Sequence, residues 1–209
     1  LDNYRRHTVG SKARSLFLLQ ENGYPVPPFF CVTGDISEGK MLAYVERHFP
    51  HVRLFSVRSC ASVEDGTSHS FAGQFRTFLR VKKEALFACV RAITEPGQAL
   101  EYAKLHQIDP SSVQIQVIIQ QMVEADCSGV LFTANPQGIL NESVIVVGRG
   151  TGDQVVKDRT DTTSYYYNLS DRIYYYEQTT DAPLLRDAQV QELIRISQKI
   201  KEQLGTECD

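Results

Sequence analysis

The spacing of apolar residues along the chain predicts several helices. In residues 10–22, Ala13, Leu16, Phe17 and Leu19 recur close to the helical period, and Gly23 follows at the usual stop position. Apolar periodicity is clearest in 187–204, where one face gathers the apolar side chains. The remaining predicted helices cover residues 38–48, 83–94 and 97–106.

Short runs rich in β-branched and aromatic residues predict strands. Phe29–Thr33 follows three prolines, which enforce an extended backbone, and 113–123 has the length and composition of a buried strand. Further strand-like runs cover 51–59, 76–81 and the start of 142–153, and 164–169 and 172–178 form a hairpin with Ser170 and Asp171 at its turn. The mixture predicts an α+β fold of two lobes, residues 1–110 and 111–209, with the boundary near 109–112.

Composition and charge narrow the classes of function. The 209 residues suffice for one large domain or two small lobes, and the net charge of −3 gives no footprint for binding nucleic acid. No apolar run is long enough to span a membrane and the first residues do not resemble a signal peptide, so we expect a cytoplasmic protein. The five cysteines are scattered without a CxxC pair, which argues against a disulfide framework or a structural zinc site.

Glycine-bearing turns and two basic residues are the first candidates for chemistry. The turns SFAGQF, SGVLFT and GRGTGD could let a backbone approach a phosphate, but none matches a dinucleotide fingerprint or a P-loop. Lys12 stands at the start of a predicted helix, where amides favour an anion, and Arg58 lies inside an apolar strand. By pattern alone, Lys12 could equally be an exposed first-turn lysine and Arg58 the partner of a salt bridge.

The segment IIQQMVEAD is the candidate for adenine recognition. An extended segment that leaves a buried strand can offer one backbone N–H and one C=O to the adenine edge, here flanked by Met122 and Val123. A core strand that ends in a polar loop explains the same pattern equally well.

Four motifs in order resemble the nucleotide-binding domain of the phosphoenolpyruvate synthase and pyruvate phosphate dikinase family. GSKARSLFLLQENGYPVPPFFCVT is similar to the family's GGK-x-x-x-L and G-x-PVPPGF-V-x-T segments, and SVRSCASVEDGTSHSFAGQFRTFL to its VRSSA-x-x-ED and SFAGQ-x-x-T segments. QQMVEADCSGVLFTANP and GRGTGDQVV resemble Q-x-MV…SGV-x-FT-x-(N/D)P and GLGE-x-VV. The resemblance implies an ATP-grasp fold with one subdomain in residues 1–110 and the other in 111–209.

The resemblance also implies a role for each matching residue, with ATP and Mg²⁺ as cofactors. Lys12 and Arg58 would hold the ATP phosphates as the catalytic cations, and Asp153 would lie near the nucleotide. Gln120, Met122 and Val123 would line the adenine pocket, while Thr133 would face the phosphates. A mobile loop would close over the β- and γ-phosphates, with Ala72 and Gly73 at its tip and Ser70 and Gln74 as the nearest polar groups.

Departures from the family pattern qualify these expectations. Ser11, Phe29 and Thr151 replace two glycines and a leucine, and Asp153 replaces glutamate. The family's metal ligands would follow Asp209, so we expect a C-terminally truncated domain that is inactive alone. The intact protein would pass a phosphoryl group from ATP to a histidine on a separate swivelling domain, and then to pyruvate or a similar acceptor. A rifampicin-type phosphotransferase, a glucan dikinase and a non-catalytic nucleotide-binding module remain alternatives.

Overall fold

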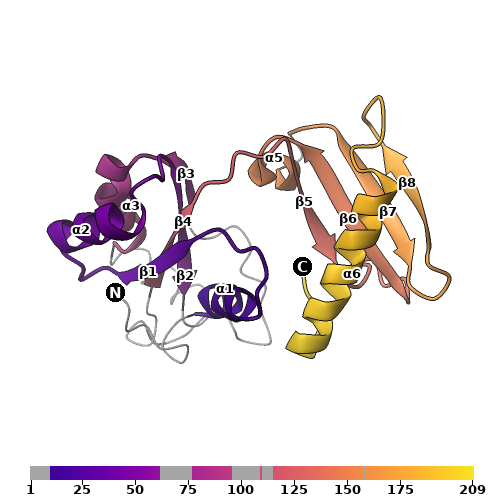
Figure 1. Cartoon of the computed structure of the whole chain (residues 1–209), viewed down its shortest axis with the longest axis horizontal. Helices are drawn as coiled ribbons and strands as arrows, with labels where there is room; N and C mark the ends of the chain where they lie inside the picture. Colours follow the sequence, from indigo (N-terminus) through magenta and orange to yellow (C-terminus); the bar gives the residue numbers. More distant parts are fainter. Residues whose placement is uncertain (1–9, 62–76, 96–108, 110–114, 158) are drawn as a thin grey trace. The chain divides into compact units, whose positions relative to one another are not determined.

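The computed structural model of the chain describes residues 10–61, 77–95, 109, 115–157 and 159–209. The chain divides into two compact units, Leu1–Val123 and Glu124–Asp209, and each is described by itself (Figure 1). The predicted helix over 97–106 and the predicted loop at 70–74 lie outside the described residues.

The first unit is a four-stranded antiparallel sheet with helices on both faces (Figure 1). Its strand order is β1-β4-β2-β3. The elements follow in the order α1 (Ser11–Glu21), β1 (Phe29–Thr33), α2 (Glu38–His48), β2 (Phe55–Ala61), β3 (Thr77–Val81), the 3₁₀ turn η2 (Lys83–Ala85), α3 (Leu86–Ile93) and β4 (Ile115–Gln121).

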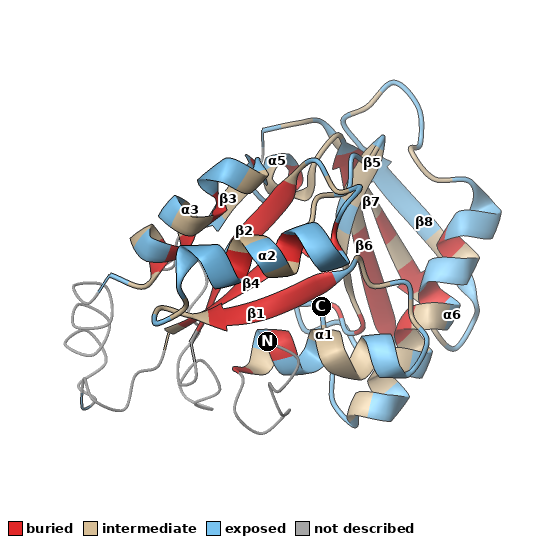
Figure 2. Cartoon of the chain, turned by 60° about the vertical axis from the view of Figure 1, so that its left-hand side comes forward, coloured by how far each residue is buried: buried red, intermediate tan, exposed pale blue. Residues whose placement is uncertain are grey.

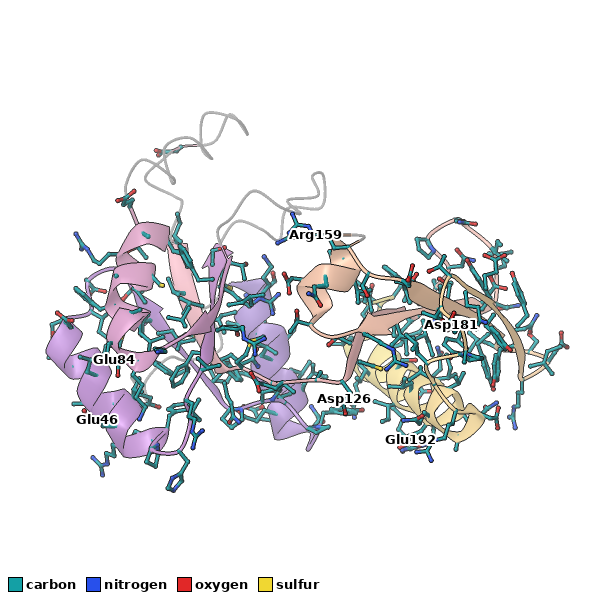
Figure 3. All side chains as sticks on the ribbon, turned by 90° about the horizontal axis from the view of Figure 1, so that it is seen from above. Glu46, Glu84, Asp126, Arg159, Asp181 and Glu192 are labelled. Atoms are coloured by element: carbon teal, nitrogen blue, oxygen red, sulfur yellow. The ribbon has the colours of Figure 1, made fainter. Side chains whose placement is uncertain are left out.

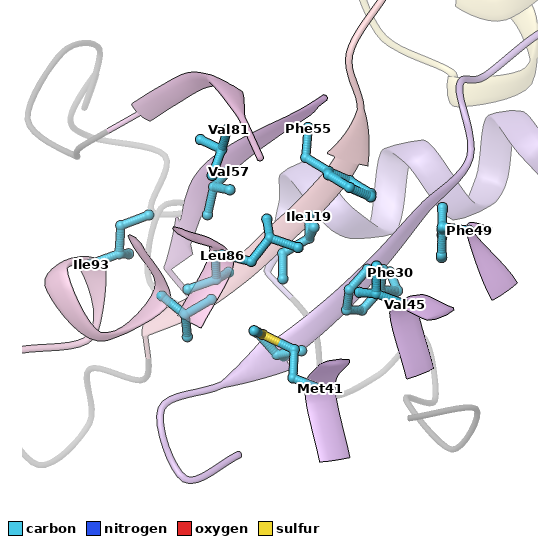
Figure 4. Close-up of a cluster of buried hydrophobic side chains, with 13 residues drawn as sticks. Phe30, Met41, Val45, Phe49, Phe55, Val57, Val81, Leu86, Ile93 and Ile119 are labelled. Carbon is cyan, nitrogen blue, oxygen red and sulfur yellow. The ribbon is translucent and has the colours of Figure 1, made fainter. Parts of the chain in front are cut away.

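Alternation along the strands gives this sheet two apolar faces. One face packs against α2 and α3 and forms the larger core, in which Phe55, Val57 and Ile119 meet Met41 and Leu86 (Figure 4). The opposite face packs against α1 through a smaller cluster. Strands β1 and β4 are mostly buried, whereas the edge strand β3 is partly exposed and the outer sides of the helices are exposed (Figure 2). The smaller cluster consists of Ala13, Phe29, Cys31, Cys60 and Ile118.

Strand β4 lies on the first side of the division between the units. We expected residues 111–123 to open the second lobe, but β4 pairs with β2 along its whole length and with β1 over residues 116–120. The units therefore divide after Val123 rather than near 109–112. Strand pairing over more than fifty residues of sequence leaves no local signal, and this is why the position of β4 could not be predicted from its neighbours in the chain.

The second unit is an antiparallel sheet in the order β5-β6-β7-β8 with one long helix packed on one face (Figure 1). Val190 and Ile194 of the helix pack against Ile145, Tyr165 and Tyr167 of the strands. The elements are β5 (Cys127–Phe132), β6 (Glu142–Arg149), α5 (Gly152–Val156), β7 (Thr162–Asn168), β8 (Ile173–Gln178) and α6 (Asp187–Leu204).

The predicted mixture of helices and strands is confirmed. The bounds of β1, α2 and α6 coincide with the predicted ranges, and β7 and β8 form the predicted hairpin. Its turn is closed by Asn168, whose side-chain oxygen accepts bonds from the amides of Ser170 and Asp171, both at 2.9 Å. Within the described part of the chain, no helix is long and apolar enough to cross a membrane.

Candidate functional site

Arg58 points from the middle of β2 to the face of the first sheet that α1 partly covers. It lies opposite Ile118, whose side chain belongs to the α1-facing cluster, and directly opposed residues of an antiparallel pair share a face. Its side chain is exposed and forms no ion pair with any described residue. The salt-bridge alternative for Arg58 therefore lacks a carboxylate in the described part of the chain.

The first turn of α1 begins on the same face. The amide of Gly10 donates to the side-chain oxygen of Gln116 at 3.2 Å, which fixes the helix start above β4. Gln116 is two residues from Ile118, so its Cα lies about 7–8 Å, one diagonal step, from that of Arg58. Among the described residues, this turn has no acidic side chain and no capping side chain, so its amides favour an anion. Lys12, in this turn, is exposed.

A buried thiol on this face has no part in nucleophilic chemistry. Burial, with a smaller contribution from nearby Cys60, raises the pKa of Cys31 to about 12. The thiol therefore stays protonated at neutral pH and serves to pack α1 against the sheet.

The end of β4 presents an unusual pattern of backbone hydrogen bonds. The amide of Gln121 donates to the carbonyl of Pro28 at 2.9 Å, as in a hydrogen-bonded antiparallel pair. Such a pair normally returns a second bond, but proline has no N–H. The Gln121 carbonyl therefore lacks the ladder donor that any other residue at position 28 would supply.

The next two residues continue this pattern. The amide of Met122 donates to the carbonyl of Leu54 at 2.9 Å, so it is already used within the first unit. Val123 follows with an exposed side chain, and its amide makes no backbone bond to the described residues. The segment thus offers one acceptor at Gln121 and one donor at Val123, two residues apart on the same edge.

The side chain of Gln120 is engaged in the protein interior. It is buried, and its amide nitrogen donates to the carbonyl of Pro27 at 3.1 Å. This bond ties β4 to the proline segment before β1. The sequence motif predicts Gln120, Met122 and Val123 as adenine contacts but does not reveal the Gln121 carbonyl, for which the proline pair at 27–28 is the available signal.

In the second unit, Thr133 holds the C-terminal segment. Its amide donates to the carbonyl of Cys208 at 3.0 Å, and its hydroxyl accepts from the amide of Cys208 at 2.8 Å. The hydroxyl also donates to the Glu207 carboxylate at 2.8 Å. Hydrogen bonds from Lys201 first, and from Thr133, hold the pKa of Glu207 below its ordinary value, so the carboxylate is ionised at neutral pH. Thr133 is only 1% exposed.

Replacing Thr133 with valine is expected to release this segment. Valine fills the same volume but leaves the Cys208 amide without its acceptor, at a cost of about 1–2 kcal/mol in the free energy of unfolding. Hydrogen exchange at the amide of Cys208 should accelerate. Thr206→Val is the matched control, because Thr206 is exposed in the same segment. Equal exchange in both variants would contradict the role given to Thr133.

Asp153 lies in the first turn of α5, after the GRG turn. Its carboxylate accepts from the Thr151 hydroxyl at 2.7 Å and lies 3.9 Å from the Lys157 ammonium. Asp153 follows the end of β6 whereas Thr133 follows the end of β5, and these strands are antiparallel. The two residues thus lie at opposite ends of the sheet, roughly 20 Å apart by strand length. The structure does not bring them together at one phosphate.

Two groups of predicted ligands are not placed by the structure. The predicted loop residues lie outside the described part: Ser70, Ala72, Gly73 and Gln74. For Mg²⁺, the described residues contain no cluster of three or more His, Cys, Asp or Glu side chains able to hold a metal ion.

Comparison with known proteins identifies the family. Residues 39–209 match the family model described as pyruvate phosphate dikinase, AMP/ATP-binding domain. The chain is 28% identical to a prodigiosin synthesizing transferase (PigC) from Serratia marcescens, over 97% of this chain and 30% of that protein. It is 32% identical to a phosphoenolpyruvate synthase from Aeropyrum pernix, over 73% of this chain and 20% of that protein.

A third relative is named for a different substrate. The chain is 37% identical to a rifampicin phosphotransferase from Streptomyces sviceus, over 49% of this chain and 12% of that protein. The chain spans less than a third of each of these relatives. The family match covers most of the chain and agrees with the motifs around Arg58 and the end of β4. The chain belongs to the AMP/ATP-binding domain family of pyruvate phosphate dikinase.

Proposed function

We propose that the first unit binds the triphosphate of ATP on the α1-covered face of its sheet. The observation that carries the proposal is the exposed Arg58 in mid-strand, one diagonal step from the residue that anchors the start of α1. An arginine fork, the ammonium of Lys12 and the amides of the first turn of α1 are the groups that bind phosphate oxygens. Phosphoryl transfer depends on this kind of positioning and charge neutralisation rather than on a protein nucleophile.

The adenine ring would be read by the backbone at the end of β4. The Gln121 carbonyl accepts from the 6-amino group and the Val123 amide donates to N1, with Met122 against the ring. The Gln121 carbonyl without its ladder donor supports this pairing, since a half-buried acceptor gains from a ligand donor. Guanine carries a carbonyl and an N–H at these positions, so the same pair of groups rejects it.

The remaining predicted ligands keep different roles. Ser70, Ala72, Gly73 and Gln74 are the proposed loop over the β- and γ-phosphates, and Asp153 is a proposed group near the nucleotide. We assign Thr133 to holding the C-terminal segment, because both functions of its hydroxyl are used by Glu207 and Cys208. A Mg²⁺ ion is expected to bind together with ATP, because phosphate oxygens are among its preferred ligands.

The proposal extends to the reaction that the whole protein would catalyse. In the ATP-grasp architecture that the resemblance implies, the phosphoryl group would pass from ATP to a histidine on a separate swivelling domain, and then to a small organic acceptor. Pyruvate fits the relatives named phosphoenolpyruvate synthase, and an antibiotic acceptor fits the rifampicin phosphotransferase equally. The five free cysteines suit a reducing compartment, so we place the protein in the cytoplasm.

The adenine contact can be tested by removing one backbone donor. Val123→Pro deletes the amide that would meet adenine N1, whereas Val123→Ala keeps it; the side chain is exposed, so its truncation is tolerated. We expect wild type and Val123→Ala to prefer ATP over GTP by about tenfold or more, and Val123→Pro to lose most of this preference. Calorimetric titration with both nucleotides measures it. An unchanged preference for ATP over GTP in Val123→Pro would refute the proposal that backbone groups recognise adenine.

A further inference from the structure

A concave surface lies in the first unit, and its lining does not include Arg58. Two connections line it: residues 50–54, between α2 and β2, and residues 82–84, between β3 and α3. The cavity has a volume of about 710 Å³ and is open to solvent, a size typical of sites for small ligands. Arg53 precedes β2 and Arg58 lies in the middle of that strand, five residues or roughly 16 Å of extended chain further on.

Cationic groups dominate the rim of this cavity. Arg53 and Lys82 are exposed, and neither forms an ion pair with a described residue. Lys83 is half-buried, and its ammonium donates to the Pro50 carbonyl at 3.5 Å, which holds it at the rim. Glu84 is the acidic residue of the lining (Figure 3). Two lysines and one arginine against one carboxylate give this lining an excess of positive charge, whereas the whole chain carries a net charge of −3.

The cavity also has an apolar wall. Pro50, Val52 and Leu54 contribute to the lining, and Val52 packs against the larger core of the unit. The backbone of this wall is fixed at both ends, because the amide of Val52 donates to the Phe49 carbonyl at 3.2 Å and the Leu54 carbonyl accepts from Met122. A preformed apolar wall beside a cationic rim complements a ligand with a small organic body and an anionic head.

We propose that this cavity binds a small organic phosphate, separately from the ATP phosphates. Phosphate suits the rim because guanidinium and ammonium groups form charge-assisted bonds to its oxygens. The organic body would pack against Pro50, Val52 and Leu54. The proposal does not depend on ATP binding, since its residues are distinct from Lys12, Arg58 and the end of β4.

Phenyl phosphate is the probe that tests this proposal, with inorganic phosphate beside it. In calorimetric titrations at low salt, phenyl phosphate should saturate one site and bind more tightly than inorganic phosphate. The triple variant Arg53→Ala, Lys82→Ala, Lys83→Ala should weaken it by about tenfold or more. Arg58→Ala and Lys40→Ala should not; Lys40 is an exposed lysine in the first turn of α2, outside the lining.

Amide chemical shifts give a reading that does not rely on the variants. Phenyl phosphate should move the amide signals of Val52 to Leu54 and of Lys82 to Glu84 in the wild-type chain. The proposal is overturned by the absence of saturable binding, by equal affinity for the two phosphates, by unchanged affinity in the triple variant, or by loss of binding in Arg58→Ala.

Discussion

Replacing Arg58 with alanine is expected to weaken ATP binding by about ten- to a hundredfold, the largest functional effect predicted for a single side chain. The estimate corresponds to about 1.5–3 kcal/mol for a charge-assisted hydrogen bond to phosphate. Arg58 is exposed and makes no ion pair with the described residues, so its removal breaks no buried contact. The melting temperature should therefore stay close to that of wild type, while calorimetry reports the lost affinity.

Two further variants separate charge from geometry. Arg58→Lys keeps the charge but loses the planar fork, so its affinity should lie between those of wild type and alanine. Arg91→Ala is the matched control, because Arg91 is an exposed arginine on α3, which packs on the opposite face of the sheet. Unchanged ATP affinity in Arg58→Ala, or an equal loss in Arg91→Ala, would remove Arg58 from the site.

Replacing Gly129 with alanine is expected to cause the largest loss of stability among these variants. A Cβ at this position would lie 2.2 Å from the Val146 carbonyl oxygen, inside the β5–β6 pairing. The clash is with backbone, so relief requires the two strands to separate locally, at a cost of about 2–3 kcal/mol. The SGVLFT segment, predicted as a turn, is therefore part of strand β5, and its glycine is explained by the close approach of two strands rather than by a phosphate.

The second unit has its own spectroscopic reporter and its own control. Six of the ten tyrosines lie in β7 and β8, and the chain has no tryptophan, so near-ultraviolet dichroism of tyrosine follows this unit. Gly152→Ala should leave the thermal transition near that of wild type, since its Cβ would meet only the Ser128 side chain at 3.9 Å. A transition for Gly129→Ala equal to that for Gly152→Ala would contradict the close approach of β5 and β6.

Local patterns predicted most helices and strands because those elements depend on nearest neighbours, but helix α5 was expected as a glycine-rich turn. The period of the apolar residues is sufficient to predict α2 and α6. The three prolines before Phe29 explain why strand β1 begins only at that residue. The place of β4 between β1 and β2 depends on pairing with residues far away in the chain. No window of sequence around 115–121 carries that information.

The candidate site also contains residues that could be predicted from local sequence and groups whose role depends on residues far away in the chain. Lys12 and Arg58 could be singled out by residue type and position, and the family resemblance gave them a role. The acceptor at Gln121 depends on which residue β1 places opposite it, and Pro28 is 93 positions away. Thr133 matched a family motif, yet its hydroxyl is occupied by residues at the other end of the second unit. A motif predicts where a residue stands in the chain, but its partners follow only from the fold.

Titration of the isotope-labelled chain with ATP, followed by amide chemical shifts, tests the central claim most directly. The account predicts saturable shifts at Ser11 to Ala13, around Arg58 and from Gln121 to Val123, with the 50–54 and 82–84 amides little changed. Absence of saturable shifts in the first set, or shifts confined to the second, would contradict the proposed ATP site.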